Sequence, residues 1–365
     1  MKLLKQYGNY IPDKNDNSVD DKKDESDGNG NSIDDKKDES DGNGNSVDDK
    51  KDEGTKKVLV TTLTDIQSKN IIAEDKKGNQ VVVPGGFKVR ADQGETVQDG
   101  IVIEDSIGNQ FVWIPVSNIN ADGSNKIIKN DGAGVEITLA RYKFTGFEMK
   151  QKGSDYTQEV VIDSGKLESN QRQESNQKNG NDATNTTAKD LKGFIDSISS
   201  NKGYYIARYE ASFGSGEKSG VITNQKPYSI YADDSKINGS AMNYEPGNVW
   251  NFITQGDAAK VCRNMYDGNQ YVTSDLINSY AWDTAIVYIQ GCSENPNYAY
   301  AYGSSSDKIC NIFNLSGRMQ EWTTETSTNS EFCCIRRGHS TMDRHNARAT
   351  LSDNDVSFRP VMYIN

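Results

Sequence analysis

The chain has 365 residues, with 41 Lys or Arg and 53 Asp or Glu, so its formal net charge at pH 7 is −12. Nonspecific binding to nucleic acid or to anionic lipid requires a basic face, and the acidic composition argues against one. Apolar residues make up only 34% of the chain, and no stretch approaches the ~18 apolar residues of a membrane helix. The first residues carry lysines without the apolar core of a secretory signal. We expect neither nucleic-acid binding nor membrane insertion.

Residues 1–57 are predicted to form a disordered acidic arm. NSVDDKKDESDGNG at 17–30 recurs as NSIDDKKDESDGNG at 31–44 and starts a third time at Asn45. The repeat has no apolar seam, which excludes a coiled coil. Its spaced acids lack the glycine and the closing Glu of a calcium loop, so calcium binding is the weaker alternative. This composition cannot bury enough apolar surface to order itself, and we predict a flexible spacer before one globular body at 58–365.

From Val58 onward, short β-branched runs alternate with glycine-containing turn signals. They predict strands at 58–64, 70–75, 80–89, 100–105, 109–116 and 135–144, with a last strand at 356–364. The stretch 164–190 is rich in Asn, Gln and Ser and has hardly an apolar side chain, which predicts a surface insertion.

Three later stretches carry apolar residues at helical spacing and predict helices at 190–199, 254–265 and 280–289. Thr254, with Asp257 three residues on, is a predicted N-cap. After the third helix the sequence predicts mainly loops up to the last strand. Many short strands, two or three helices and long loops together predict an irregular α+β fold.

The five cysteines are Cys262, Cys292, Cys310, Cys333 and Cys334. Their number is odd and none forms a CxxC pair, which argues against a disulfide framework and against a zinc site. We expect them to be small buried residues, as free cysteines often are.

Several motifs follow one another in a fixed order. They are KGYYIARYEAS (202–212), VWNFITQGDAAKVCRNMY (249–266), SYAWDTAIVYI (279–289), NLSGRMQEWTTET (314–326), IRRG (335–338) and VSFRPVMYI (356–364). In this order, over roughly residues 80–365, they resemble the formylglycine-generating-enzyme, or sulfatase-modifying-factor, family. The resemblance implies a variant of the C-type lectin fold. A fold carries many functions, so the motifs indicate the fold more strongly than the activity.

The resemblance also implies roles for single residues. Gly317 and Trp322 would fix the turn and the hydrophobic plug of the family's GNVWEW motif. Arg318 stands where the family has Asn, which puts any family calcium site there in doubt. Trp250, Trp282 and Trp322 are expected to anchor the core, because large aromatic side chains dominate core burial.

The oxidases of this family act through two cysteines shortly after an RGGS-like segment and bind copper through thiolates. Here no cysteine follows Cys334, and the family's cysteine positions carry residues such as Asp343 and Arg348. The only histidines, His339 and His345, are six residues apart, which matches no helical metal pair. We therefore expect no catalytic residue, no metal and no cofactor, and a copper-dependent formylglycine-generating-type oxidase is the alternative function.

Residues 336–365 have an unusual composition. They hold both histidines and five of the eleven arginines, but no Lys, Glu, Gln or Trp. This pattern resembles the variable region of proteins diversified by retroelements, in which adenine-directed mutation of Asn-type codons yields Asn, Ser, Thr, Asp, His and Arg. Met342 departs from that set and would be a fixed position. An ordinary polar loop of a noncatalytic paralogue is the alternative interpretation.

The predicted recognition surface consists of polar side chains between framing strands, because short polar residues suit adaptable hydrogen bonding. It comprises Ser340, Thr341, Asp343, Arg344, His345, Asn346, Ser352, Asp353, Asn354 and Asp355. These side chains are expected to vary without touching the core. The predicted function is noncatalytic binding of a protein or glycan ligand on a cell surface, by a protein of a phage virion or a bacterial surface. A structural subunit of a virion or an appendage is a further alternative.

Overall fold

The structure is a computed structural model. It describes residues 57–119, 128–130, 135–152, 155–162, 191–213, 226–232, 247–293, 298, 307–317, 319–326, 334–338, 340–348 and 351–365, without the side chains of 128–130, 143–152, 155–162, 326, 334–336, 340–343 and 346. The chain divides into two units, Met1–Gly54 and Thr55–Asn365. The predicted acidic arm and the predicted insertion at 164–190 lie outside the described residues.

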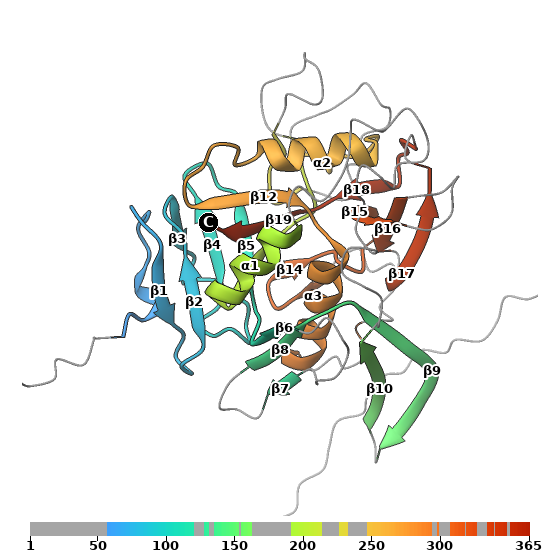
Figure 1. Cartoon of the computed structure of the whole chain (residues 1–365), viewed down its shortest axis with the longest axis horizontal. Coiled ribbons are helices and arrows are strands. Elements are labelled where there is room, and N and C mark those ends of the chain that lie inside the picture. Colours follow the sequence, from blue (N-terminus) through green and yellow to red (C-terminus); the bar gives the residue numbers. More distant parts are fainter. Residues whose placement is uncertain are drawn as a thin grey trace, which may run out of the picture. The chain divides into compact units, whose positions relative to one another are not determined.

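The second unit is mixed α+β, and its largest element is a six-stranded antiparallel sheet (Figure 1). The strands, in spatial order, are β12 (Val272–Leu276), β19 (Pro360–Ile364), β11 (Gly203–Ala207), β5 (Gln110–Pro115), β4 (Val102–Asp105) and β3 (Phe87–Val89). β11 lies between β19 and β5, and all five of its residues are buried. The C-terminal strand therefore lies inside this sheet, next to a strand more than 150 residues earlier in the sequence.

A second, four-stranded sheet has the order β17-β16-β15-β18. Its strands are β15 (Gln320–Thr326), β16 (Cys334–Gly338), β17 (Ser340–Ala347) and β18 (Val356–Phe358). The β15–β18 pair is parallel and the other two pairs are antiparallel. The single last strand predicted at 356–364 is wrong, because the chain leaves this sheet at Arg359 and enters the six-stranded sheet at Pro360.

The remaining strands form smaller sheets. These are β1 (Ile71–Glu74) with β2 (Gln80–Val83), β6 (Asn118–Ile119) and β7 (Ile128–Asn130) on either side of β8 (Val135–Leu139), β9 (Tyr142–Lys152) with β10 (Asp155–Ile162), and β13 (Lys308–Ile309) with β14 (Ile312–Phe313).

The strand predicted at 58–64 is wrong. Leu59 makes only an isolated bridge to Glu74, and Val60–Thr62 form a short 3-10 helix. Val60 is fully buried, and the helix turns the chain so that the carbonyl of Leu63 accepts a hydrogen bond from the Val89 amide. Here tertiary packing outweighs the β propensity of the run.

The three helices lie where the sequence predicts them, as α1 (Leu191–Asn201), α2 (Gln255–Asn264) and α3 (Ser279–Cys292). α1 packs Phe194 edge-on against Tyr204 and Tyr363 of the six-stranded sheet. The predicted cap of α2 is confirmed, because the Thr254 hydroxyl accepts a hydrogen bond from the Asp257 amide. α3 is capped by Asn278 and is buried on all sides over its first eleven residues, so it lies between sheets and not on a surface.

The turns β1–β2 and β4–β5 are built alike. In the first, Asp75 Oδ1 accepts from the amides of Lys77 and Asn79. In the second, Asp105 Oδ1 accepts from the amides at 107 and 109. The fourth residue of each turn is a glycine with positive φ, 84° at Gly78 and 94° at Gly108, a backbone region that glycine enters without steric cost.

The asparagine that ends each of these turns also holds a distant segment. Asn79 Oδ1 accepts a hydrogen bond from the Val135 amide at 3.0 Å, and Asn109 Oδ1 accepts one from the Ser229 amide at 2.9 Å. The sequence D-x-x-G-N thus forms both a hairpin turn and a long-range anchor, twice in the same unit.

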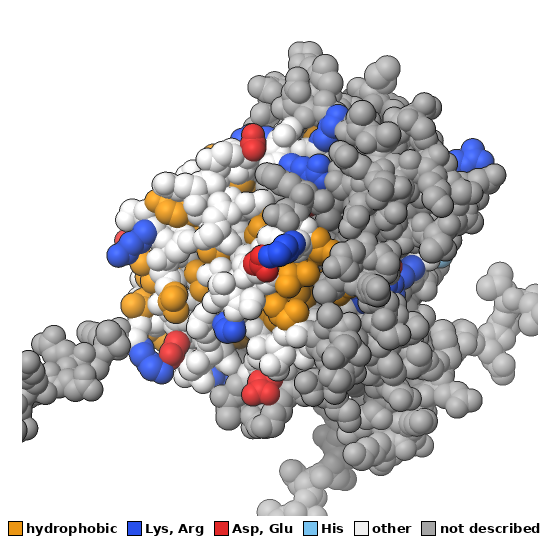
Figure 2. Space-filling view, in the orientation of Figure 1, with side chains coloured by type: hydrophobic (Ala, Val, Ile, Leu, Met, Phe, Trp, Pro, Cys, Tyr) orange, Lys and Arg blue, Asp and Glu red, His pale blue; other side chains and the backbone are white. Residues whose placement is uncertain are grey.

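The apolar side chains of the described residues form two main clusters. One lies between the six-stranded sheet and helices α1 and α3, and the other lies between α2 and the four-stranded sheet. Trp250, Trp282 and Trp322 are fully buried, as predicted, and the Trp322 indole donates to the carbonyl of Ile253 at 2.8 Å. On the face shown in Figure 2, the hydrophobic side chains that reach the surface lie in small groups among polar and charged ones.

Replacing Asp105 with Ala should lower the free energy of unfolding by at least about 3 kcal/mol. The change removes the acceptor of two backbone amides, of the Asn109 side chain and of the Tyr266 hydroxyl, and hydrogen bonds to a charged group contribute about 1.5–3 kcal/mol each. Urea unfolding measures the change. The exposed Asp65 is the control, and D65A should shift stability by no more than about 0.5 kcal/mol. Equal stabilities of D105A and D65A would contradict the role of the turn.

Candidate functional site

The predicted recognition residues 340–346 do not form a loop. They belong to β17, which pairs with β16 and is an edge strand of the four-stranded sheet as far as the chain is described. The sequence gives no sign of this strand, because its residues are short and polar and β propensity gives little signal for them. The side chains of Ser340, Thr341, Asp343 and Asn346 lie outside the described residues, whereas His345 is half-buried.

The predicted residues 352–355 form an irregular segment that leads into β18. Ser352, Asn354 and Asp355 are exposed and Asp353 is half-buried. The main chain of this segment is held at three carbonyls: that of Asp353 accepts from the Phe252 amide at 2.9 Å, that of Asn354 from the Asn251 side chain at 2.9 Å, and that of Asp355 from the Gln320 amide at 2.8 Å.

The strand register decides which of these residues lie near one another. Ser340 pairs with Gly338, Gly338 with Gln320, and Gln320 with Val356, so these residues form one row across one end of the sheet. Three strand spacings separate Ser340 from Val356, about 14 Å. Asn346 pairs with Ile335 toward the opposite end. The structure therefore places Ser340 and Thr341 at the same end as 352–355, and it places residues 343–346 away from them.

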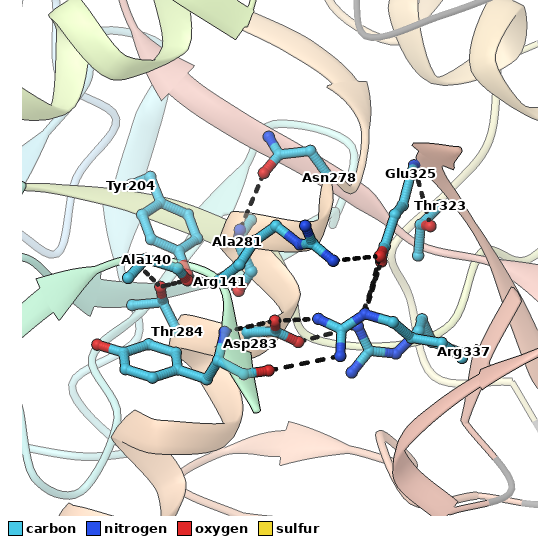
Figure 3. A network of polar contacts seen from close by, with 12 residues as sticks. Ala140, Arg141, Tyr204, Asn278, Ala281, Asp283, Thr284, Thr323, Glu325 and Arg337 are labelled. Atoms are coloured by element: carbon cyan, nitrogen blue, oxygen red, sulfur yellow. Dashed lines mark hydrogen bonds and ion pairs between the residues drawn. The ribbon is translucent and has the colours of Figure 1, made fainter. Parts of the chain in front are cut away.

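Arg344 of β17 takes part in a buried network of ionic groups. Figure 3 shows the network from close by, with Asp283, Glu325 and Arg337 labelled. The network centres on two carboxylates, Asp283 of α3 and Glu325 of β15, which are 0% and 2% exposed. Arg344 Nε lies 2.8 Å from Glu325 Oε1, and its Nη2 contacts Asp283 Oδ2. Arg337 Nη1 lies 2.9 Å from Asp283 Oδ1, and Arg141 Nη2 lies 3.1 Å from Glu325 Oε1.

Arg344 and Arg337 both remain charged in this network. Burial lowers the pKa of Arg344, but the charges of Asp283 and Glu325 outweigh burial and raise it overall. Burial, and then the like charge of Arg344, lower the pKa of Arg337. A guanidinium remains protonated at neutral pH even so, because its unperturbed pKa exceeds 12. The guanidinium of Arg337 also lies 5.5 Å from the centroid of the Trp282 ring.

The expectation that every side chain of the predicted surface is free of the core is thus wrong for Arg344. Its side chain is only 22% exposed, and it joins β17 to α3 and to β15. Its contacts leave it no role as a freely varying recognition residue.

A second buried ion pair joins the two large sheets. Arg359 Nη2 lies 2.7 Å from Glu321 Oε1 and Arg359 Nε lies 3.1 Å from Glu321 Oε2, a bidentate pair in which both side chains are at most 1% exposed. The guanidinium also donates to the carbonyls of Ala207 in β11 and Phe313 in β14. Burial alone would lower the pKa of Arg359, but the Glu321 carboxylate raises it, so the guanidinium stays charged.

The motifs that carry the family resemblance supply most of these pairs. Glu321 comes from QEW, Arg337 from IRRG, Arg359 from FRP, and Asp283 from AWDT. Sequence reasoning did not predict the pairing. The available signal was Asp283, the one charged residue of a largely apolar helix, because a buried carboxylate requires a cationic partner.

The described cysteines are poor candidates for thiolate chemistry. Burial raises the pKa of the Cys262 thiol far above its usual value and raises that of Cys310 to about 12; burial and the nearby Cys310 also raise that of Cys292. These thiols stay protonated at neutral pH, whereas nucleophilic attack and copper binding need the thiolate. Cys333 lies outside the described residues, and Cys334 lies on β16.

Within the described ranges, no group of three or more His, Cys, Asp or Glu side chains is arranged to hold a metal ion. The described helices are also too short or too polar for any of them to cross a membrane.

Comparisons with protein-family models, with curated proteins and with solved structures found no match for this chain. The geometry of the site therefore carries the functional argument alone.

Replacing Arg344 with Met should destabilise the protein by about 2–4 kcal/mol, because it removes a cation that faces two buried carboxylates. K69M changes an exposed lysine and should cost about 0.5 kcal/mol or less. Chemical unfolding of both variants gives the comparison. If R344M is as stable as K69M, Arg344 has no structural role and returns to the recognition surface.

Proposed function

We propose that this protein is a noncatalytic binding protein whose recognition surface is the segment 352–355 together with the start of β17 at Ser340 and Thr341. The observation that carries the proposal is the separation of roles within 352–355. Main-chain carbonyls fix the segment, while the side chains of Ser352, Asn354 and Asp355 are exposed. Such an arrangement tolerates changes of side chain without changes of backbone, which suits a surface whose specificity varies.

The buried ion pairs support the same proposal. Several acidic and basic residues of the motifs are enclosed, as the Glu321–Arg359 pair and the contacts of Asp283 illustrate. Groups so enclosed stabilise the fold but cannot reach a substrate. Val356 and Phe358 are buried directly after the exposed segment. The proposed variable residues 352–355 are therefore followed at once by residues of the buried framework.

We further propose that the domain is a variant of the C-type lectin fold of the formylglycine-generating-enzyme type, diversified in its C-terminal part. The support is the order of the motifs and the fact that QEW forms an ion pair with FRP, and IRRG with AWDT. The partner would be a protein or a glycan on a cell surface, bound by a protein of a virion or of a bacterial surface. The oxidase alternative would need a thiolate pair outside the described residues, and nothing in the described geometry favours the structural-subunit alternative.

The test uses a triple variant, S352A/N354A/D355A, of the full chain. Labelled protein is incubated with a panel of intact bacterial strains, untreated, protease-treated or periodate-treated, and cell-bound fluorescence is measured. The triple variant should melt within a few degrees of the wild type, because exposed substitutions cost little, and should lose at least tenfold in cell binding. Loss after protease treatment indicates a protein partner, and loss after periodate indicates a glycan.

The matched control is D65A/S68A/K69A, which changes three exposed residues of another surface segment and should bind as the wild type does. Unchanged binding of the 352–355 variant would contradict the proposal, as would an equal loss in both variants.

A further inference from the structure

A second surface is built from three aromatic side chains on elements that the proposed recognition segment does not use. Tyr209 follows β11, Tyr231 lies in the segment 226–232, and Phe313 ends β14. The Tyr209 and Phe313 rings lie 4.8 Å apart at 36°, and Tyr231 stands nearly perpendicular to both, at 6.0 and 6.5 Å. We call these three residues the aromatic platform.

The platform faces solvent. Tyr231 is 68% exposed, and Tyr209 and Phe313 are each partly exposed. The turn between β4 and β5 approaches the segment of Tyr231: a Cβ at Gly108 would lie 3.9 Å from the side chain of Ile230, and the neighbouring Ile107 is 64% exposed. Large exposed apolar side chains that gather in one place mark interaction sites more often than isolated ones do.

Cations already lie against the rings. The Arg208 guanidinium is 5.3 Å from the Tyr209 centroid and 5.2 Å from the Phe313 centroid, and Lys308 Nζ is 5.6 Å from the Phe313 centroid. Arg208 is 3% exposed, and it donates to the amide oxygens of Gln110 and Gln93 at 2.6 Å each. No carboxylate lies within ion-pair distance of it among the described residues.

Polar groups surround the platform on the side of Arg208. The Gln110 side chain, which accepts from Arg208, donates to Glu104 Oε2 at 2.8 Å, and Glu104 in turn pairs with Arg90 at 2.6 Å. Asp92 lies 2.8 Å from Arg90 and is 58% exposed. Hydrogen-bond donors and acceptors are therefore both present next to the rings.

These features favour one class of ligand. A cationic ligand would meet Arg208 and Lys308 at the ring faces that it needs. Arg208 is enclosed and bonded to Asn311, Gln110 and Gln93, which leaves it unable to pair with an anionic ligand, and the chain's net charge of −12 repels a polyanion at long range. A neutral sugar ring fits, because its C–H face packs on the electron-rich face of an aromatic ring while its hydroxyls bond to polar groups at the edge. Tyrosine suits such a contact, since it offers a large rigid ring at a low cost in conformational entropy.

We propose that the aromatic platform is a binding site for a neutral glycan, with Tyr231 as the main stacking residue. The proposal is independent of the recognition segment 352–355, which uses other residues and carries a separate test.

The experiment measures the binding of the fluorescently labelled full chain to a microarray of printed neutral and acidic glycans. The wild type should bind a set of neutral glycans. Y231A should lower that signal at least tenfold, and Y231F, which keeps the ring, should retain most of it. Ile72, a 67% exposed side chain of β1, gives the control I72A, which should bind as the wild type does. Melting curves of all variants should agree within a few degrees, because both positions are exposed.

The outcomes are distinct. Neutral-glycan binding that depends on Tyr231 and persists in S352A/N354A/D355A supports the platform even if the recognition segment has no role. Absence of binding to any printed neutral glycan overturns the proposal, and so does binding confined to acidic glycans or binding that Y231A leaves unchanged. If Y231A instead abolishes capture of a protein partner while no glycan binds, the platform is a protein interface and the glycan assignment is wrong.

Discussion

The fold of residues 55–365 depends on one buried ion pair, that between Glu321 and Arg359. Arg359 occupies the single position at which the chain passes from the four-stranded sheet to the six-stranded sheet. Its guanidinium bonds bidentately to Glu321 of β15 and also to the carbonyls of Ala207 and Phe313. A buried guanidinium is tolerated only when such partners satisfy it, so the pair fixes both the position of the break and the relation between the two sheets.

The network around Asp283 and Glu325 also pairs buried charges, and it lies toward β17, the edge of the four-stranded sheet opposite β18. It joins α3, β15, β16 and β17 through Arg337 and Arg344. Residues that look functional in the sequence, because they are charged and occur in motifs, thus hold the framework. The exposed side chains of Ser352, Asn354 and Asp355 and the rings of the aromatic platform are distinct from the ionic side chains of both networks, although the main-chain carbonyl of Phe313 accepts a hydrogen bond from Arg359. The side chains that fix the framework therefore differ from those that we propose to bind.

Local patterns in the sequence predicted the local structure well. Apolar spacing gave all three helices, the Thr254 cap was correct, and β-branched runs gave β1, β4 and β5. The single strands predicted at 80–89 and 135–144 are wrong, because the chain breaks each of them into two strands, at 84–86 and at 140–141. Long-range pairing was not visible: nothing local to 356–364 shows that Arg359 bonds to Glu321, and nothing local to 340–347 shows that this polar run pairs with β16. Arg344 resembled a surface residue because its partners, Asp283 and Glu325, are distant in the sequence. The sequence did not predict the platform, because its three rings come from segments far apart in the chain and no local pattern of residues links them.

The most direct measurement of this account is a double-mutant cycle on Glu321 and Arg359, with E321Q, R359M and the double variant compared by chemical unfolding. Each single change should cost about 3–5 kcal/mol, because it leaves a buried group without its partner, and the double variant should cost far less than the sum. The exposed pair of Lys192 and Asp196 on α1 is the control, with a coupling of about 0.3–0.5 kcal/mol. Costs at Glu321 and Arg359 that simply add, with a coupling no larger than that of the control, would contradict the claim that this pair holds the two sheets together.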